Sequence, residues 1–316
     1  MNPRFLSARS ILRTLIIIVI LGFAMHLLLP QIGEVREGMI AFRQGRWPFL
    51  GITFIGLALT YFADAWMIRS SVKNSPPWTQ IILIEIAGFF ASAVTPASLG
   101  WVIINQQYLE HYGNDSKSAR TGITLFILLT ITVYTTMLLI MLLLLPSLKI
   151  PKVHLPATFV ILEIGACLLA AIGIALWIPA SRRKILEETY PVFNAFPEVF
   201  RYPKRTAVMV LASVTSYFAY GISLAGAIAA FGHTLPFIGI LLAYCIAVSV
   251  STMSPTPGGL GAMEMTLTTI LSWLGLPAGS AIASVLTFRL ITFWIPIPLG
   301  GWTLHYVIKR GWIFKP

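Results

Sequence analysis

The sequence predicts an all-α membrane protein with about six spanning helices and two re-entrant helical hairpins in an inverted repeat. Hydrophobic residues make up 57% of the 316 residues, charged residues make up only 10%, and the mean hydropathy is +0.84. A soluble domain carries about 25% charged residues, because its surface must stay hydrated. Apolar runs of the ~18 to 25 residues needed to cross hydrocarbon recur along the whole chain. We therefore expect a single transmembrane domain over residues 1–316.

Six of the apolar runs are continuous enough to span the membrane as single helices. The first follows Arg4, Arg9 and Arg13, a flank that it would share with a secretory signal peptide. No small-residue cleavage pattern follows it, so we interpret it as an uncleaved span. The expected spans are residues 12–29, 48–68, 121–145, 158–178, 207–231 and 281–308.

Two further apolar regions, residues 81–109 and 237–274, are each interrupted by proline and glycine. The interruptions are Thr95-Pro-Ala-Ser-Leu-Gly100 and Ser254-Pro-Thr-Pro-Gly-Gly-Leu-Gly261. Proline removes a backbone donor and glycine adds conformational freedom, so neither region should form one straight helix. Each is predicted to be two half-helices that meet at a tip, which protein or a wet cavity must cover at membrane depth.

The basic residues indicate whether these regions cross the bilayer or turn back, because cytoplasmic loops are enriched in Lys and Arg. If both turn back and the N-terminus is cytoplasmic, about 16 basic residues lie inside and about 5 outside. If the first region crossed, Lys117, Arg120 and the basic cluster at 182–184 would move outside, and the bias would disappear. We therefore predict re-entrant hairpins, with both termini on the cytoplasmic side of the inner or plasma membrane.

The remaining composition argues against several other functions. The net charge of +11 suits loops that face anionic lipid, and no basic cluster lies on a polar, aromatic-interleaved segment that would predict a nucleic-acid partner. Cys167 and Cys245 lie in apolar runs and are expected to be core residues without a disulfide. The histidines lack metal-ligand spacing, and no nucleophile elbow is present. We expect no enzymatic activity and no cofactor.

The two halves of the chain, approximately 1–150 and 151–316, share one order of elements: span, span, hairpin, span. The first half starts inside and the second outside, and their Thr-Pro tips are offset by about 161 residues. Matched Pro/Gly-interrupted segments in inverted halves point to a transporter binding site at the bilayer midplane. The alternative is a chance match between two low-complexity apolar segments, but the independent topology argument favours a repeat.

A half-helix that begins at such a tip presents free N–H groups and the positive end of its dipole. Two opposed tips would aim both ends at one buried place, where an anion such as a lipid phosphate fits. Gly258, Gly259 and Gly261 would let a headgroup approach the backbone, or would only permit tight helix packing. After the first tip, Asn105 would line the cavity, whereas Gln107 marks the return of the hairpin to the cytoplasmic interface.

Glu264 and Arg289 lie deep in apolar segments, where an unpaired charge costs at least ~2.5 to 3.5 kcal/mol. We expect them to pair, as a structural ion pair, a gate, or a headgroup and proton site. Glu85 and Asp64 are also acidic residues in apolar segments, and the same roles are open to them. Asp64, however, lies near a cytoplasmic helix end and is expected to reach water. The expected lipid-binding residues are Thr95, Pro96, Gly100, Asn105, Thr256, Pro257, Gly258, Gly259, Gly261, Glu264 and Arg289.

The stretch from Ser254 to Gly261, with Glu264 shortly after it and Arg289 in the next span, resembles the membrane domain of lysylphosphatidylglycerol synthases. Gly88-Phe-Phe90, with Thr95-Pro and Gly100, resembles the first-half motif of that domain, and the resemblance covers nearly the whole chain. It implies a domain that moves aminoacylated phosphatidylglycerol from the inner to the outer leaflet. A separate soluble domain makes that lipid in the best-known members.

Two departures limit what the resemblance implies. No soluble domain accompanies the predicted spans, so the synthase activity is not implied. Family members commonly carry an arginine just after the first-half glycine, where this chain has Ile103-Ile-Asn-Gln106. The repeat offset also places Ile103 and Leu128 opposite Glu264 and Arg289, so the first half is expected to have lost its charges.

These patterns support three hypotheses about function. The first is a lipid translocase, in which a phospholipid or glycolipid headgroup enters a midplane cavity and one half rocks against the other. The alternative is a membrane subunit or partner of a lipid-modifying or polyprenyl-sugar glycosyltransferase system. A third is an intramembrane transferase that uses Glu264 with Glu85 as its acid/base pair. Membrane lipids are the expected partners, and a homo-oligomer is left open.

Overall fold

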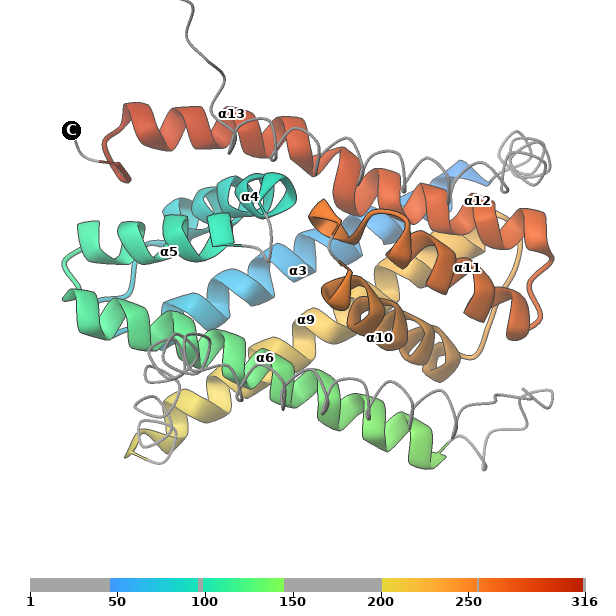
Figure 1. Ribbon diagram of the computed structural model, residues 1–316. Helices are drawn as coiled ribbons and strands as arrows, with labels where there is room; N and C mark the ends of the chain where they lie inside the picture. Colours follow the sequence, from blue (N-terminus) through green and yellow to red (C-terminus); the bar gives the residue numbers. More distant parts are fainter. Residues whose placement is uncertain (1–45, 96–98, 145–200, 255, 315–316) are drawn as a thin grey trace, which may run out of the picture.

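The computed structural model describes residues 46–95, 99–144, 201–254 and 256–314, and the regular elements in these ranges are all helices (Figure 1). The expected spans at 12–29 and 158–178 lie outside the described residues, as do Pro96 and Cys167. The elements are η2 (Trp47–Phe49), α3 (Leu50–Ser71), α4 (Trp78–Val94), α5 (Leu99–His111), α6 (Ser116–Leu144), α9 (Pro203–Ala230), α10 (Phe237–Met253), η5 (Pro257–Gly259), α11 (Ala262–Trp273), α12 (Ala278–Arg289), η6 (Leu290–Trp294) and α13 (Pro296–Lys309).

Four helical segments of the described ranges are long and apolar enough to cross a membrane. Each coincides with one of the four spans that the sequence predicts there. The protein is therefore an all-α, multi-pass membrane protein. The segments are Trp47–Ser71, Ser116–Met141, Pro203–Ala230 and Ala278–Lys309.

The two interrupted apolar regions form helical hairpins, as predicted. α4 packs against α5, and α10 packs against α11. Figure 1 shows the hairpins in opposite halves of the molecule, with both tips turned toward its middle. The breaks therefore bring two loops close to the centre of the protein, where continuous helices would have passed straight through.

The order of elements repeats along the chain. α3, α4, α5 and α6 correspond to α9, α10, α11 and the segment from α12 to α13. α4 and α10 have 17 residues each, while α5 has 13 and α11 has 12. Figure 1 shows α3 and α9 running in opposite directions, and so do α6 and the segment from α12 to α13. The described parts of the halves thus follow the inverted order.

Small residues let α3 and α9 pack closely against each other. A Cβ atom added at Gly56 would lie 2.6 Å from the backbone nitrogen of Ser223, and one at Gly226 would lie 2.7 Å from that of Thr53. The hydroxyl of Ser223 donates a hydrogen bond of 3.0 Å to the carbonyl oxygen of Thr53. Close backbone contact and polar bonds of this kind are how helices associate in membranes. This crossing joins the first half of the chain to the second.

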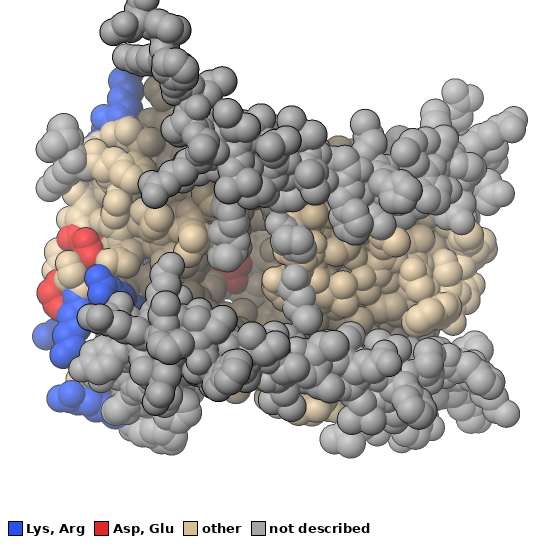
Figure 2. All heavy atoms as spheres, viewed as in Figure 1, with Lys and Arg blue, Asp and Glu red and all other residues tan. Residues whose placement is uncertain are grey.

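Basic side chains gather at one end of the molecule (Figure 2). Arg205 is anchored there by a bond of 2.6 Å from its Nε to the carbonyl oxygen of Ser70. Among the described residues, only Arg46 and Arg289 lie elsewhere, so the charge asymmetry follows the predicted topology. The basic residues at this end are Arg69, Lys73, Lys117, Arg120, Arg201, Lys204, Arg205, Lys309 and Arg310.

Candidate functional site

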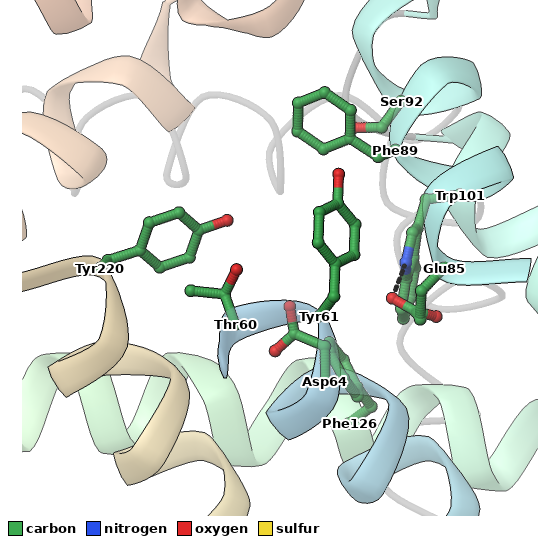
Figure 3. A pocket seen from close by; sticks show the side chains of 9 residues that line it. All are labelled: Thr60, Tyr61, Asp64, Glu85, Phe89, Ser92, Trp101, Phe126 and Tyr220. Atoms are coloured by element: carbon green, nitrogen blue, oxygen red, sulfur yellow. Dashed lines mark hydrogen bonds between the residues drawn. The ribbon is translucent and has the colours of Figure 1, made fainter. Parts of the chain in front are cut away.

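A cavity of about 170 Å³ lies where α3, α4, α5, α6 and α9 meet. Most of its wall comes from the first half of the chain, and α9 adds one side from the second (Figure 3). Acidic atoms are also visible deep in the middle of the face in Figure 2. The residues that line the cavity are Thr60, Tyr61, Asp64, Glu85, Phe89, Ser92, Trp101, Phe126 and Tyr220.

Two carboxylates face this cavity from neighbouring helices, Asp64 from α3 and Glu85 from α4 (Figure 3). Glu85 is only 4% exposed, and its Oε2 accepts a bond of 3.1 Å from the indole nitrogen of Trp101. Its Oε1 has no hydrogen-bond partner among the described residues. Within the described ranges, neither carboxylate forms an ion pair.

Phenol groups and aromatic faces complete the cavity. The hydroxyl of Tyr61 is buried without a hydrogen-bond partner in the described part of the chain, and Tyr220 points into the same space (Figure 3). The rings of Trp101 and Phe126 lie 4.7 Å apart at their centroids and form one wall. Carboxylates attract cations directly, and aromatic faces attract them through the ring quadrupole. The lining is therefore suited to a cationic group and not to an anion.

Glu264 and Arg289 form an ion pair at the second tip, as the sequence predicts. Arg289 Nε lies 2.6 Å from Glu264 Oε1, and the two side chains are only 9% and 12% exposed. Arg289 also donates a bond of 3.2 Å to the carbonyl oxygen of Gly258 and stacks over Phe293, 4.1 Å from its centroid. Glu264 Oε2 accepts a bond of 2.7 Å from the backbone N–H of Gly261. Together these contacts tie the tip to α12.

The glycines of the second tip serve its loop conformation. Gly258, Gly259 and Gly261 have φ angles of 62°, 64° and 83°, in the left-handed region where a side chain is strained. A Cβ atom added at Gly258 would collide with the ring of Phe293. These observations favour the packing role of the glycines. Because Glu264 already occupies the N–H of Gly261, an anion at this tip would have to displace that carboxylate.

The loop before these glycines is closed by its own polar groups. Thr256 Oγ1 donates a bond of 2.9 Å to the carbonyl oxygen of Leu260 and lies 2.8 Å from the hydroxyl of Ser254. Pro257 begins the short helix η5. Thr256 and Pro257 are thus part of the tip, as expected, and the hydroxyl of Thr256 is engaged within it.

The first tip is capped in the same way. Thr95 Oγ1 accepts a bond of 2.9 Å from the N–H of Gly100 and donates one of 2.6 Å to the carbonyl oxygen of Ala91. A Cβ atom added at Gly100 would lie 2.5 Å from that same carbonyl oxygen, so glycine permits the close approach of α4 and α5. Side chains therefore satisfy backbone groups at both tips.

The polar residues after the first tip separate into two environments. Asn105 is completely buried and donates a bond of 3.1 Å to the carbonyl oxygen of Trp101, while its Oδ1 has no partner in the described ranges. It lies behind Trp101 and is not among the cavity-lining residues. Gln107 Oε1 accepts a bond of 3.1 Å from the backbone N–H of Phe314 at the basic end, which confirms that the hairpin returns there.

Asp64, which was expected to reach water at a helix end, lies within α3 and is half-buried. α3 continues past Asp64 to Ser71, and the carboxylate lines the cavity near Glu85. The first half therefore keeps two acidic side chains, the buried Glu85 and the half-buried Asp64, although not at the position matched to Glu264, where Ile103 is 46% exposed. One signal could have found this site: Thr60, Tyr61 and Asp64 lie at i, i+1 and i+4, on one face of a helix.

The acid/base pairing needed for an intramembrane transferase is not formed. Glu264 pairs with Arg289, whereas Glu85 shares its cavity with Asp64. Trp101 and Tyr220 could not be recognised as cavity residues from sequence, because both look like ordinary aromatic residues of apolar helices.

A row of aromatic rings connects the cavity with the ion pair. Tyr61 meets Phe89 edge-to-face at 6.3 Å, Phe89 meets Phe293 at 5.9 Å, and Phe293 supports the guanidinium of Arg289. Such edge-to-face pairs contribute about 0.5–1.5 kcal/mol beyond the area they bury. The cavity of the first half and the tip of the second half are therefore in direct packing contact.

Comparisons with known proteins agree with this architecture. The sequence profile described as "Lysylphosphatidylglycerol synthase TM region" matches residues 10–300. A UPF0104 membrane protein of Pyrococcus horikoshii is 29% identical over 125 residues, which cover 38% of this chain and 37% of that protein. A UPF0104 membrane protein of Methanothermobacter thermautotrophicus is 32% identical over 72 residues, which cover 23% of this chain and 22% of that protein. The aligned parts thus span less than half of either relative.

Proposed function

The chain belongs to the family of the lysylphosphatidylglycerol synthase transmembrane region, and from that premise we propose that it is a lipid translocase. In this proposal a lipid headgroup passes through the middle of the protein between the inverted halves, while the acyl chains stay in the bilayer. The proposal involves no covalent chemistry. The observation that supports it most is the cavity, whose two carboxylates have no ion-pair partner among the described residues.

The energetic position of these carboxylates favours a role in binding. An unpaired charge at membrane depth costs at least ~2.5 to 3.5 kcal/mol, and such residues usually mark substrate or ion pathways. Arg289 is the cationic residue that the structure describes in the interior, and it already forms an ion pair with Glu264. Among the described residues, neither Asp64 nor Glu85 therefore has an ion-pair partner that would offset the cost of its charge. The broken hairpins give the same indication, because interrupted helices at matched positions surround transporter binding sites.

The chemistry of the cavity favours a headgroup that carries an ammonium group. Two carboxylates, two phenols and aromatic walls attract a cation, whereas at the tips the N–H groups of Gly100 and Gly261 are engaged within the protein. The cavity, of about 170 Å³, has room for a small polar group of this kind. Amine-bearing phospholipids, which include the aminoacylated lipids that the family resemblance implies, are the proposed substrates.

The charge asymmetry supports one orientation in the membrane. The basic end carries the N-terminal ends of α4, α6 and α9 and the C-terminal end of α13. Since cytoplasmic loops are enriched in Lys and Arg, we place this end, and with it the C-terminus, on the cytoplasmic side. The α4–α5 hairpin would then enter from the cytoplasm and the α10–α11 hairpin from the opposite side.

Reconstitution tests this function. The purified protein is placed in liposomes with acyl-chain-labelled phosphatidylethanolamine, lysylphosphatidylglycerol or phosphatidylglycerol, and label in the outer leaflet is bleached with dithionite. We expect faster exchange of the two amine-bearing lipids than of phosphatidylglycerol. Asp64→Asn should slow that exchange, whereas Asp115→Asn, on an exposed loop, should not. If no lipid class moved faster than in protein-free liposomes, the translocase proposal would be wrong.

A further inference from the structure

We infer that Asp64 and Glu85 together form a proton-binding site, and that the bound proton leaves when the ammonium group of a headgroup arrives. The inference rests on the proposed function for its second step only. The protein would then exchange one proton for one cationic headgroup, which gives lipid movement a source of energy and a direction.

The first argument is the geometry of the two acids. Asp64 and Glu85 face one cavity from adjacent helices, with Tyr61 near both (Figure 3). Glu85 is 4% exposed, and its Oε1 is a buried acceptor without a donor in the described part of the protein. Two carboxylates that share a poorly hydrated site cannot both be ionised cheaply. A single proton removes one negative charge and supplies a donor within the pair.

The second argument is that the other groups around the cavity cannot take this role near neutral pH. Tyr61 and Tyr220 line the cavity from α3 and α9, the ring of Tyr244 on α10 stacks on Tyr220 at 4.9 Å, and Tyr134 on α6 lies 6.4 Å from Tyr244. Phenols in water titrate near pH 10, so these groups stay protonated at neutral pH. α5 contributes only the indole N–H of Trp101, which already binds Glu85.

The nearest cation also does not neutralise the acids. Arg289 is separated from the cavity by Phe293 and Phe89, and its Nε binds Glu264 while one of its terminal nitrogens binds Gly258. Among the described residues that line the cavity, Asp64 and Glu85 are the only carboxylic acids. The proton therefore belongs to the pair.

The charge balance of the exchange is simple. With one proton bound, the pair carries a net charge of −1. When an ammonium group arrives and the proton departs to water, two carboxylates and one cation again give −1. Only the vacant, fully deprotonated pair carries −2, and its burial makes that state costly. The protein therefore passes between the proton-bound and the ammonium-bound state and avoids the vacant one. Proton movement in one direction is thereby coupled to lipid movement in the other.

The proton site is tested first without transport. Infrared difference spectra of the purified protein in liposomes report the carbonyl band of a protonated carboxylic acid. We expect the wild type to show this band at neutral pH and the double variant Asp64→Asn/Glu85→Gln to lack it. Both substitutions keep the side-chain shape, and retained thermal stability will show that the variant folds. A control variant, Asp115→Asn, should keep the band. No band in the wild type, or an unchanged band in the double variant, would overturn the inference.

The exchange is tested next in proteoliposomes with acyl-labelled lysylphosphatidylglycerol and a pH-sensitive dye inside. With an imposed pH gradient, the labelled lipid should accumulate in the leaflet that faces the more acidic compartment, by up to about tenfold per pH unit for one-for-one exchange. Lipid movement that ignored the pH gradient would refute the exchange and leave the translocase proposal intact. A response to a sodium gradient in place of the pH gradient would assign the site to an inorganic cation. A protonated-acid band without any lipid movement would instead refute the proposed function and the exchange with it.

Discussion

The acidic side chains inside the two halves of the molecule have opposite surroundings. In the second half, both oxygens of Glu264 are occupied, one by Arg289 and one by the N–H of Gly261. In the first half, Asp64 and Glu85 share a cavity without an ion-pair partner in the described ranges, and one oxygen of Glu85 has no donor. The difference indicates two roles. The ion-paired Glu264 stabilises a loop, whereas Asp64 and Glu85 remain available to a ligand.

The largest effect should come from breaking the ion pair. Arg289→Met leaves Glu264 buried with the N–H of Gly261 as its remaining partner, and loss of one member of a buried pair costs about 3–5 kcal/mol. Thermal unfolding in detergent should therefore shift to a much lower temperature. Adding Glu264→Gln to this variant should restore part of the loss, because it removes the stranded charge. Equal stability of Arg289→Met and the wild type would show that the pair does not stabilise the tip.

The conformation of the second tip should give the next largest effect. Gly258→Ala introduces a side chain at a φ of 62°, against the ring of Phe293, and should cost about 1–3 kcal/mol. Gly51→Ala is the matched control, because a Cβ atom there meets no atom within 4 Å. The two variants are compared by thermal unfolding. If Gly258→Ala were as stable as the control, the tip would not be held in the conformation described above.

The unpaired acids should show the opposite behaviour. A hydrogen bond to a charged group contributes about 1.5–3 kcal/mol, so Asp64→Asn should slow exchange of an amine-bearing lipid by at least about tenfold. Its thermal stability should stay level or rise, since the substitution removes a half-buried charge that has no ion-pair partner in the described ranges. Exchange rates and unfolding temperatures are measured on the same preparation. Loss of thermal stability without slower lipid exchange would show that Asp64 has a structural role, like that of Glu264 in the second half.

The smallest effect concerns an acid outside the membrane. Hydrogen bonds from Ser118 hold the pKa of Asp115 below its usual range, at the start of α6. The folded-state pKa is lowered, so this contribution is present above the unfolded value of about 3.9 and is lost as the pH falls through the lower folded value. Below about pH 4, the unfolding temperature of the wild type should therefore fall slightly more than that of Asp115→Asn. Parallel pH curves would contradict this assignment.

The sequence predicted those features that depend on local chemistry or on a single strong constraint. Proline and glycine at the two tips predicted the hairpins, and the cost of an isolated charge in an apolar segment predicted that Glu264 and Arg289 would pair. The role of Asp64 could not be predicted in this way. It depends on how α4 packs beside α3, and distance from a span end says nothing about that. The tips also looked open in sequence, because the hydroxyl of Thr95 and the carboxylate of Glu264 cap them only once the loops have folded.

The packing of α3 against α9 has a mechanical consequence for the proposed translocase. At Gly56 the two backbones touch, and a hydrogen bond from Ser223 to Thr53 joins the helices there. Toward the basic end, Arg205 of α9 donates a hydrogen bond to Ser70 of α3, so the two helices are fastened to each other at separate places along their length. Such a pair would have to move as one unit. Alternate opening on the two membrane faces would then come from the two hairpins moving against this unit.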